Sequence, residues 1–229
     1  MNSSIKTAVS VAANREWVYT LEHFGVSETE LSVSPFGQYF TRQIGGKDVL
    51  VYFAGRGRKA AGSAAAQYFI DKMNVGKIIV VGTAAGIDER NNILDIIIPN
   101  TAVQCDASVK EMAPLINDRF TVELPLPKLP FDFKTGVIGT TDKPVVMWRD
   151  HVELRDNGIT IADMEAAAIA YICRLNGVGC VIVKGISDFA IDESKSSLAE
   201  SESVQHEDFR RNVPIIMKRI FDSYLAYLV

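Results

Sequence analysis

The segment DMEAAAIAYICRLNGVGCVIVKGISDFA, residues 163–190, constrains the fold more than any other part of this 229-residue chain. It places Glu165 in the first turn of a predicted Ala-rich helix, Met164–Leu175. A short apolar strand, Cys180–Val183, follows and leads to a second acid, Asp188. In α/β proteins, ligands bind at the edge of the sheet where such elements end. The segment therefore predicts two carboxylates at a ligand-binding edge of a sheet.

The rest of the chain alternates between strand-like and helix-like runs, which is typical of α/β folds. The apolar runs that we expect to form strands are Ala8–Ala13, Val49–Ala54, Lys77–Val81, Leu94–Pro99, Gly136–Gly139 and Gly158–Ala162. The predicted helices are Trp17–Phe24, Lys59–Met73, Val145–Asp156 and the amphipathic Glu207–Val229. We therefore expect one domain over residues 1–229, a three-layer αβα sandwich around a mixed, twisted sheet.

Three local features refine this picture. Gly45-Gly46 lies between two strand-like runs and predicts a hairpin. Pro214 should kink the last helix or mark its true start, because proline disrupts a helix interior. The Ser- and Glu-rich stretch Asp192–Ser203 predicts a mobile surface segment.

Composition argues against several classes of function. The chain has 24 Lys or Arg and 28 Asp or Glu, a net charge of -4, and so lacks the basic excess of nucleic-acid-binding proteins. No stretch approaches the ~20 apolar residues of a membrane span, and the N-terminal residues lack the apolar run of a signal peptide. Three cysteines without pair-like spacing fit a reducing compartment. We therefore expect a cytoplasmic protein with no nucleic-acid or membrane partner.

Motifs for nucleotide cofactors and metals do not match either. The glycines of Val81–Gly86 do not form GxGxxG, and the GRGRK run at residues 55–59 is not a Walker A loop. The three histidines, His23, His151 and His206, show no zinc-binding spacing. We therefore expect neither a cofactor nor a metal ion.

Four predicted strand ends are rich in small residues and acids. They are Ala13–Glu16, Gly55–Arg58, Gly82–Gly86 and Ser187-Asp188. One such loop alone is ordinarily a simple turn. Four such loops, two of which carry an acid, favour a site where a ligand approaches the backbone closely. Asp188 follows the apolar run CVIVKGIS, and apolar surroundings raise the pKa of a carboxyl group. Asp188 is therefore a candidate proton donor near neutral pH.

The stretch DMEAAAIAYIC, followed by VIVKGISDFA, resembles the purine-specific branch of the nucleoside phosphorylase/nucleosidase superfamily. Within that branch it is most similar to the 5'-methylthioadenosine/S-adenosylhomocysteine nucleosidases. VVGTAAGI at residues 80–87 and AGRGRKAA at residues 54–61 are similar to the family at lower specificity. The resemblance covers most of the chain. It implies a nucleoside phosphorylase-like αβα sandwich that binds a purine nucleoside and forms a homo-oligomer, often a dimer in the nucleosidases.

The resemblance also implies roles for individual residues. Asp188 would protonate purine N7, with Ser187 beside it, and Glu16 would activate the attacking water. Glu165, which we expect to be ionised, would accept hydrogen bonds from the ribose hydroxyls above Met164. The small-residue loop under the nucleoside would consist of Thr83, Ala84, Ala85 and Gly86. An acid on the base and a second carboxylate for the water parallel the paired carboxylates of glycosidases.

The chain departs from the family at several positions. VAANREW at the first strand end and Val80 before Val81-Gly82-Thr83 lack the phosphate-binding arginines of the phosphorylases, which favours water as the nucleophile. Arg56 borders the sugar and could bind phosphate, a charged substrate tail or solvent, as could Arg58. Pro144 and Val145 stand where the nucleosidases have an adenine-stacking aromatic. Either that stacking falls to another residue, for which Phe189 is the candidate, or the base differs. Lys184 replaces a family arginine, an exchange that we expect to matter little.

Three functions fit these residues. We expect a purine nucleosidase that acts on a 5'-modified adenosine. The first alternative is a phosphate-dependent purine nucleoside phosphorylase, and the second is a non-catalytic nucleoside-binding module on the same fold. Retention of both Glu16 and Asp188 argues against the last, because a mere binding module needs no acid at N7.

Overall fold

The computed structural model describes residues 5–55, 59–105, 121–190 and 198–229. Within them, eleven strands form one sheet. The strands are β1 (Thr7–Val11), β2 (Ser32–Ser34), β3 (Gly37–Ile44), β4 (Lys47–Phe53), β5 (Lys77–Gly86), β6 (Ile96–Ile97), β7 (Thr101–Gln104), β8 (Thr121–Glu123), β9 (Val137–Thr140), β10 (Ile161–Asp163) and β11 (Gly179–Phe189). The helices are α1 (Asn14–Phe24), α2 (Lys59–Met73), α4 (Trp148–Asp156), α5 (Ala166–Leu175), α6 (Leu198–Ile220) and α7 (Ala226–Leu228), with a π-helix at Phe221–Leu225 between the last two.

The sheet is mixed, as predicted. β1 pairs in parallel with β4 on one side and with the first half of β5 on the other. β11 runs parallel to the whole length of β5, whereas β10 meets the last residues of β5 in antiparallel orientation. The hairpin between β3 and β4 turns at Gly45 and Gly46, both with positive φ, which confirms the predicted turn. Because β1, β10 and β11 all pair with β5, their last residues lie close together at one edge of the sheet.

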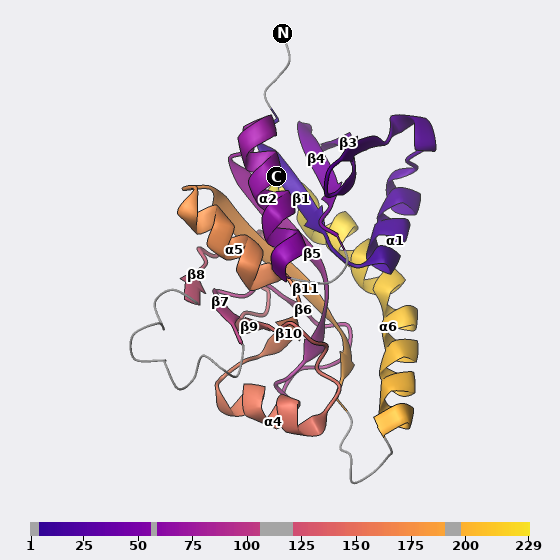
Figure 1. Ribbon diagram of the computed structural model, residues 1–229, viewed down its shortest axis with the longest axis vertical. Helices are drawn as coiled ribbons and strands as arrows, with labels where there is room; N and C mark the ends of the chain where they lie inside the picture. The colour runs from indigo at the N-terminus through magenta and orange to yellow at the C-terminus, as the bar shows by residue number, and fades with distance from the viewer. Residues whose placement is uncertain (1–4, 56–58, 106–120, 191–197) are drawn as a thin grey trace.

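Helices cover both faces of the sheet, so the three-layer prediction is confirmed (Figure 1). On one face, α2 and α5 pack closely because small residues line both helices: a Cβ on Gly62 would lie 3.2 Å from Ile169. On the other face, Trp17 of α1 and an apolar stripe of α6 that includes Val213, Ile216 and Ile220 pack on the sheet. The sheet therefore has a separate apolar core on each side.

Several predicted boundaries are wrong. The strand expected to stop at Val183 continues to Phe189, because it pairs with β5 throughout, with a register shift between Ile186 and Asp188. The helices expected from Met164 and from Val145 begin at Ala166 and Trp148. Sequence periodicity cannot locate these ends because backbone pairing and capping decide them.

The last helix also differs from its prediction. It begins at Leu198 and stays helical through Pro214, so Pro214 does not mark its start. Residues 198–203, which we expected in a mobile segment, form the first turns of α6, while residues 192–197 of that segment lie outside the described part of the chain.

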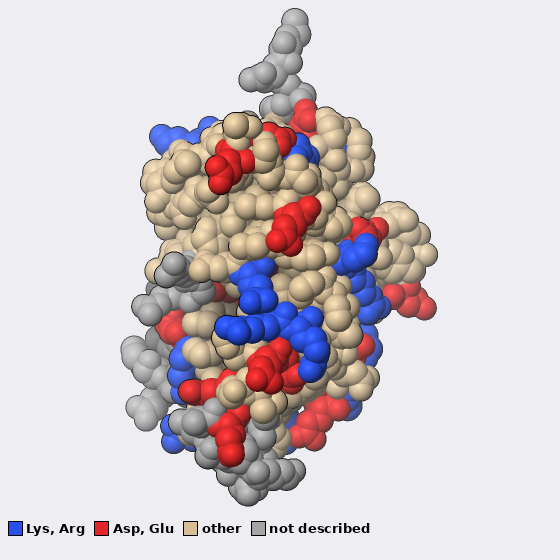
Figure 2. Space-filling model, turned by 90° about the vertical axis from the view of Figure 1, so that its right-hand side faces the viewer, with Lys and Arg blue, Asp and Glu red and all other residues tan. Residues whose placement is uncertain are grey.

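The face that carries α6 mixes charges of both signs (Figure 2). Lys and Arg side chains gather near its centre, and Asp and Glu side chains lie beside them. Along α6, Arg211 pairs with Asp208, and Lys218 pairs with Asp222 of the following π-helix. Exposed pairs of this kind contribute little to stability. Among the described residues, no helix is both long and apolar enough to cross a membrane.

Candidate active site

A cavity of about 270 Å³ lies at the edge where β1, β5, β10 and β11 end. The walls of this cavity come from both halves of the sequence, from Ala13 to Phe209. The lining residues are Ala13, Glu16, Thr83, Ala84, Ala85, Thr141, Pro144, Val145, Ala162, Asp163, Met164, Glu165, Lys184, Ser187, Asp188, Gln205 and Phe209. Its size is close to that of pockets that bury small ligands.

The structure brings most of the predicted site residues together. The cavity wall contains Glu16, Thr83, Ala84, Ala85, Val145, Met164, Glu165, Ser187 and Asp188. Gly86 and Phe189 are not among the described lining residues, and the Phe189 ring lies 2.4 Å from where a Cβ on Gly86 would be. Phe189 therefore packs on the strand beside it, where only a glycine leaves room. Arg56 lies outside the described residues.

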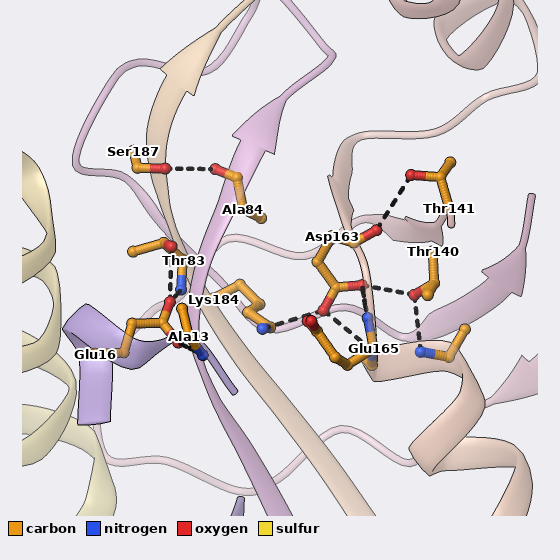
Figure 3. A network of polar contacts seen from close by, with 12 residues as sticks. Ala13, Glu16, Thr83, Ala84, Thr140, Thr141, Asp163, Glu165, Lys184 and Ser187 are labelled. Atoms are coloured by element: carbon orange, nitrogen blue, oxygen red, sulfur yellow. Dashed lines mark hydrogen bonds and ion pairs between the residues drawn. The ribbon is translucent and has the colours of Figure 1, made fainter. Parts of the chain in front are cut away.

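Glu16 stands in the first turn of α1 and is 2% exposed. One of its carboxylate oxygens accepts hydrogen bonds from Thr83 N at 2.6 Å and Thr83 Oγ1 at 2.7 Å, and the other from Ala13 N at 3.2 Å (Figure 3). Gly82 makes this approach possible: at its φ of +147°, a Cβ would lie 2.8 Å from both carboxylate oxygens. Three donors therefore hold Glu16 in one orientation at the cavity wall.

Asp188 lies at the end of β11, just past the register shift. Ser187 Oγ donates a hydrogen bond to its Oδ1 at 2.5 Å, and Asn212 of α6 donates to the Ser187 carbonyl at 2.7 Å. Burial raises the pKa of Asp188 to about 6, against the lowering effect of the Ser187 hydrogen bond. The predicted rise is confirmed. A carboxyl group with a pKa of about 6 can donate a proton near neutral pH.

Lys184 lies at the centre of the site, between Glu16 and Glu165 (Figure 3). Its Nζ is 3.1 Å from Asp163 Oδ2, and both side chains are buried. Burial by itself disfavours the charged amine, but Asp163, Glu16 and Glu165 outweigh it, so the pKa of Lys184 is raised. The residue is therefore a fixed positive charge among three carboxyl groups.

Asp163 also organises the start of α5. Its carboxylate accepts hydrogen bonds from the amide of Ala166 at 3.0 Å and from Thr140 Oγ1 at 2.6 Å. Thr140 Oγ1 in turn accepts a hydrogen bond from the amide of Ala167 at 2.9 Å. These contacts satisfy amides of the first helical turn, which have no partner within the helix. The same contacts fix the backbone that presents Glu165 to the cavity.

Glu165 differs from its prediction. Burial, with a further contribution from the charge of Asp163, raises its pKa to about 8, although Lys184 opposes the rise. The raised pKa favours the protonated carboxyl group at neutral pH, whereas we expected an ionised one. The physical reason is that Glu165 is buried beside the charges of Asp163 and Glu16, and Lys184 offsets these effects only in part.

Sequence reasoning missed or undervalued several lining residues, among them Lys184, Gln205 and Phe209. Lys184 could have been found, because a lysine inside the apolar run CVIVKGIS must have a buried partner if that run is a strand. Gln205 and Phe209 come from α6, one helical turn apart, and reach the cavity only because α6 packs against β11 and β5. Nothing in their local sequence separates them from the surface and core residues of an amphipathic helix. Among the described residues, no group of three His, Cys, Asp or Glu could hold a metal ion.

The fold and the site together define a three-layer α/β protein with a carboxylate-lined cavity at its strand ends. A sequence profile of the phosphorylase superfamily matches residues 15–228, and the chain belongs to that superfamily.

Named relatives and solved structures agree with this assignment. The 5'-methylthioadenosine/S-adenosylhomocysteine nucleosidase of Tolumonas auensis is 26% identical over 230 residues, covering 92% of this chain and 95% of that protein. The enzyme of the same name from Geobacillus sp. is 25% identical, over 84% of this chain and 90% of its own.

Among solved structures, the nucleosidase of the same name from Campylobacter jejuni has a TM-score of 0.71 at 16% identity, covering 93% of this chain and 97% of that one. The futalosine hydrolase of Helicobacter pylori has a TM-score of 0.70 at 19% identity, covering 97% and 99%. At these identities, the structures confirm the fold.

Proposed function

We propose that the protein hydrolyses the N-glycosidic bond of a purine nucleoside, a 5'-modified adenosine of the methylthioadenosine/S-adenosylhomocysteine type. One observation carries the proposal: a carboxyl group that can donate a proton, Asp188, and a firmly oriented carboxylate, Glu16, line the same cavity. The curated relatives that match most of the chain are nucleosidases by name, which supports the same reaction.

In the proposed reaction, each of the two carboxyl groups takes part in one proton transfer. Asp188 donates its proton to purine N7 as the N-glycosidic bond breaks, so that the electron pair of that bond leaves with a neutral base. Glu16 accepts a proton from the water whose oxygen bonds to the sugar carbon. Each such proton transfer is typically worth a factor of about 10²–10⁴ in rate. Thr83 and Ala13 hold the Glu16 oxygens, so the base does not need to reorient before it acts.

The sugar and the base have candidate partners in the same cavity. Glu165 offers two oxygens to the ribose hydroxyls, and Met164 beside it offers an apolar surface. Because the pKa of Glu165 is about 8, binding a diol that prefers the ionised form would release a proton at neutral pH. Phe209 provides an aromatic surface in the described lining, a role that we expected of Phe189.

Phosphorolysis has less support. Among the described lining residues, Lys184 is the one cation, and it is already paired with Asp163. A phosphate in that place would face the carboxylates of Asp163 and Glu16, and like charges at close range oppose binding.

The deciding experiment is incubation with a panel of purine nucleosides, with and without phosphate. Free base and free ribose in phosphate-free buffer are the expected products. Strict dependence on phosphate would identify a phosphorylase, and no turnover of any nucleoside would identify a binding module.

We further propose, from the resemblance, that the protein is a cytoplasmic homodimer and that residues 1–229 form one domain. The described cysteines, Cys105, Cys173 and Cys180, form no disulfide, which is compatible with a reducing compartment. Light scattering after size-exclusion chromatography tests the dimer, because it gives the mass of the particle directly.

A further inference from the structure

Gln205 of α6 ties together two backbone segments at one end of the cavity. Its Nε2 donates hydrogen bonds to the carbonyl of Val145 at 3.3 Å and to the carbonyl of Phe189 at 3.1 Å. The side chain is 7% exposed and forms part of the cavity wall. It therefore connects the segment before α4 with the end of β11.

These two partners fix the orientation of the amide group. Both are carbonyl oxygens, which only accept hydrogen bonds, so the NH₂ end of Gln205 must face them. The Oε1 atom is then the end that remains for a ligand. Among the described residues, no donor is bonded to Oε1. A nearly buried acceptor at a cavity wall favours a ligand that brings a donor, because an unpaired buried polar atom is costly.

The position of Gln205 identifies the part of the ligand that it would meet. Phe189, whose carbonyl it binds, directly follows Asp188, the proposed acid for purine N7. The substituent at purine position 6 is the neighbour of N7 on the same edge of the base. An amino group there donates a hydrogen bond, whereas an oxo group presents an acceptor against Oε1.

We propose that Gln205 selects the base: its Oε1 accepts a hydrogen bond from the 6-amino group and disfavours 6-oxopurine nucleosides. This inference rests on the proposed function and adds a residue that sets specificity. Asp188 and Glu16 would transfer protons in the chemical step, whereas Gln205 would determine which purine nucleoside binds.

The test compares 5'-methylthioadenosine with its 6-oxo counterpart, 5'-methylthioinosine, as substrates of the wild type and of Gln205→Met. Methionine keeps the length of the side chain and removes the acceptor. We expect the wild type to prefer the 6-amino substrate in kcat/KM and the preference to fall by about tenfold or more in the variant, the range expected for one lost hydrogen bond at a buried site.

Asn212→Leu is the matched control. Asn212 lies on the same helix and also donates to a carbonyl of β11, that of Ser187, but it is not among the described lining residues. Its loss should change kcat/KM for both substrates by the same factor. If Gln205→Met behaves in the same way, Gln205 only positions the backbone and the inference is wrong.

Two further outcomes keep the inference separate from the proposed function. Equal kcat/KM for both nucleosides in the wild type would overturn the role of Gln205 and leave nucleoside hydrolysis intact. No hydrolysis of either nucleoside would overturn both. Should Gln205→Met fail to fold, inhibition of the wild type by the free bases compares a 6-amino with a 6-oxo purine. We expect adenine to inhibit more strongly than hypoxanthine, and equal inhibition constants would overturn the inference.

Discussion

The amine of Lys184 lies 3.1 Å from Oδ2 of Asp163, and both side chains are almost fully shielded from water. The pair joins the middle of β11 to the end of β10, at the place where the cavity begins. Since Asp163 also accepts a hydrogen bond from the amide of Ala166, the first residue of α5, Lys184 is linked through one carboxylate to the backbone that presents Glu165. A residue that we expected to matter little therefore stands at the electrostatic centre of the site.

Replacing Lys184 with methionine should destabilise the protein by about 3–5 kcal/mol, because Asp163 would remain buried without its partner. Urea unfolding measures the change. Lys143→Met is the control, since Lys143 forms an exposed pair with Asp150 and should cost less than ~1 kcal/mol. Equal effects of the two substitutions would mean that the buried pair does not stabilise the fold.

Asp188→Asn should lower kcat by about 10²–10⁴ while nucleoside binding persists, because asparagine keeps the shape of the side chain but cannot deliver the proton. Steady-state kinetics and calorimetric binding on the same preparation separate the two effects. A variant with wild-type kcat would show that Asp188 is not the N7 acid.

Ser187→Ala should move the pH dependence of kcat/KM. In the wild type, activity should fall as the pH rises through about 6, because Asp188 must carry a proton. The hydrogen bond from Ser187 lowers the pKa of Asp188, so its removal raises that pKa and shifts the fall in activity to higher pH. Ser34→Ala, which removes a partly buried hydrogen bond from a residue outside the described cavity lining, should leave the profile in place. A shift to lower pH would contradict this assignment.

Glu165→Gln should flatten the pH dependence of stability. The pKa of Glu165 rises from 4.5 to about 8 on folding, so the folded state takes up a proton that the unfolded state does not hold between those values. Its contribution to stability is complete below pH 4.5 and is lost as the pH rises through about 8. The loss amounts to a few kcal/mol, at about 1.4 kcal/mol per pKa unit.

Urea unfolding over that pH range measures this effect, and we expect the free energy of unfolding to fall less in Glu165→Gln than in the wild type. Identical slopes in the two proteins would show that Glu165 titrates normally in the folded state.

Gly82→Ala should abolish turnover and destabilise the fold, because its Cβ would meet both Glu16 oxygens at 2.8 Å in a backbone conformation that alanine rarely adopts. Gly179→Ala is the control: the nearest atom to a Cβ there lies 3.6 Å away, so both stability and turnover should stay close to wild type. Thermal unfolding and nucleoside hydrolysis report the two effects. Retained activity in Gly82→Ala would show that Glu16 does not need its observed position.

Local sequence was enough to predict the alternating strands and helices, the hairpin at Gly45-Gly46 and two acids at the ends of neighbouring elements. These features depend on periodicity, glycine conformation and residue type, which are visible within a few residues. The length of β11 was not predictable in this way, because its last residues stay extended through pairing with β5. The same limitation applies to Phe189, whose ring packs against Gly86.

The amino-acid sequence by itself determined the fold class and which reactive groups stand at the strand ends. A carboxyl group that follows an apolar run is costly to bury unless it has a partner or binds a ligand, so its position alone indicated a site. The tertiary structure decided which charges share the site. Only the packing of β10, β11 and α6 in the folded chain brings Asp163, Lys184 and Gln205 to the same cavity. The burial of Glu165 and its distance from the charges of Asp163 and Lys184 raise its pKa to about 8. Electrostatic interactions depend on distance and on exclusion of water, and neither is encoded in the spacing of residues along a chain.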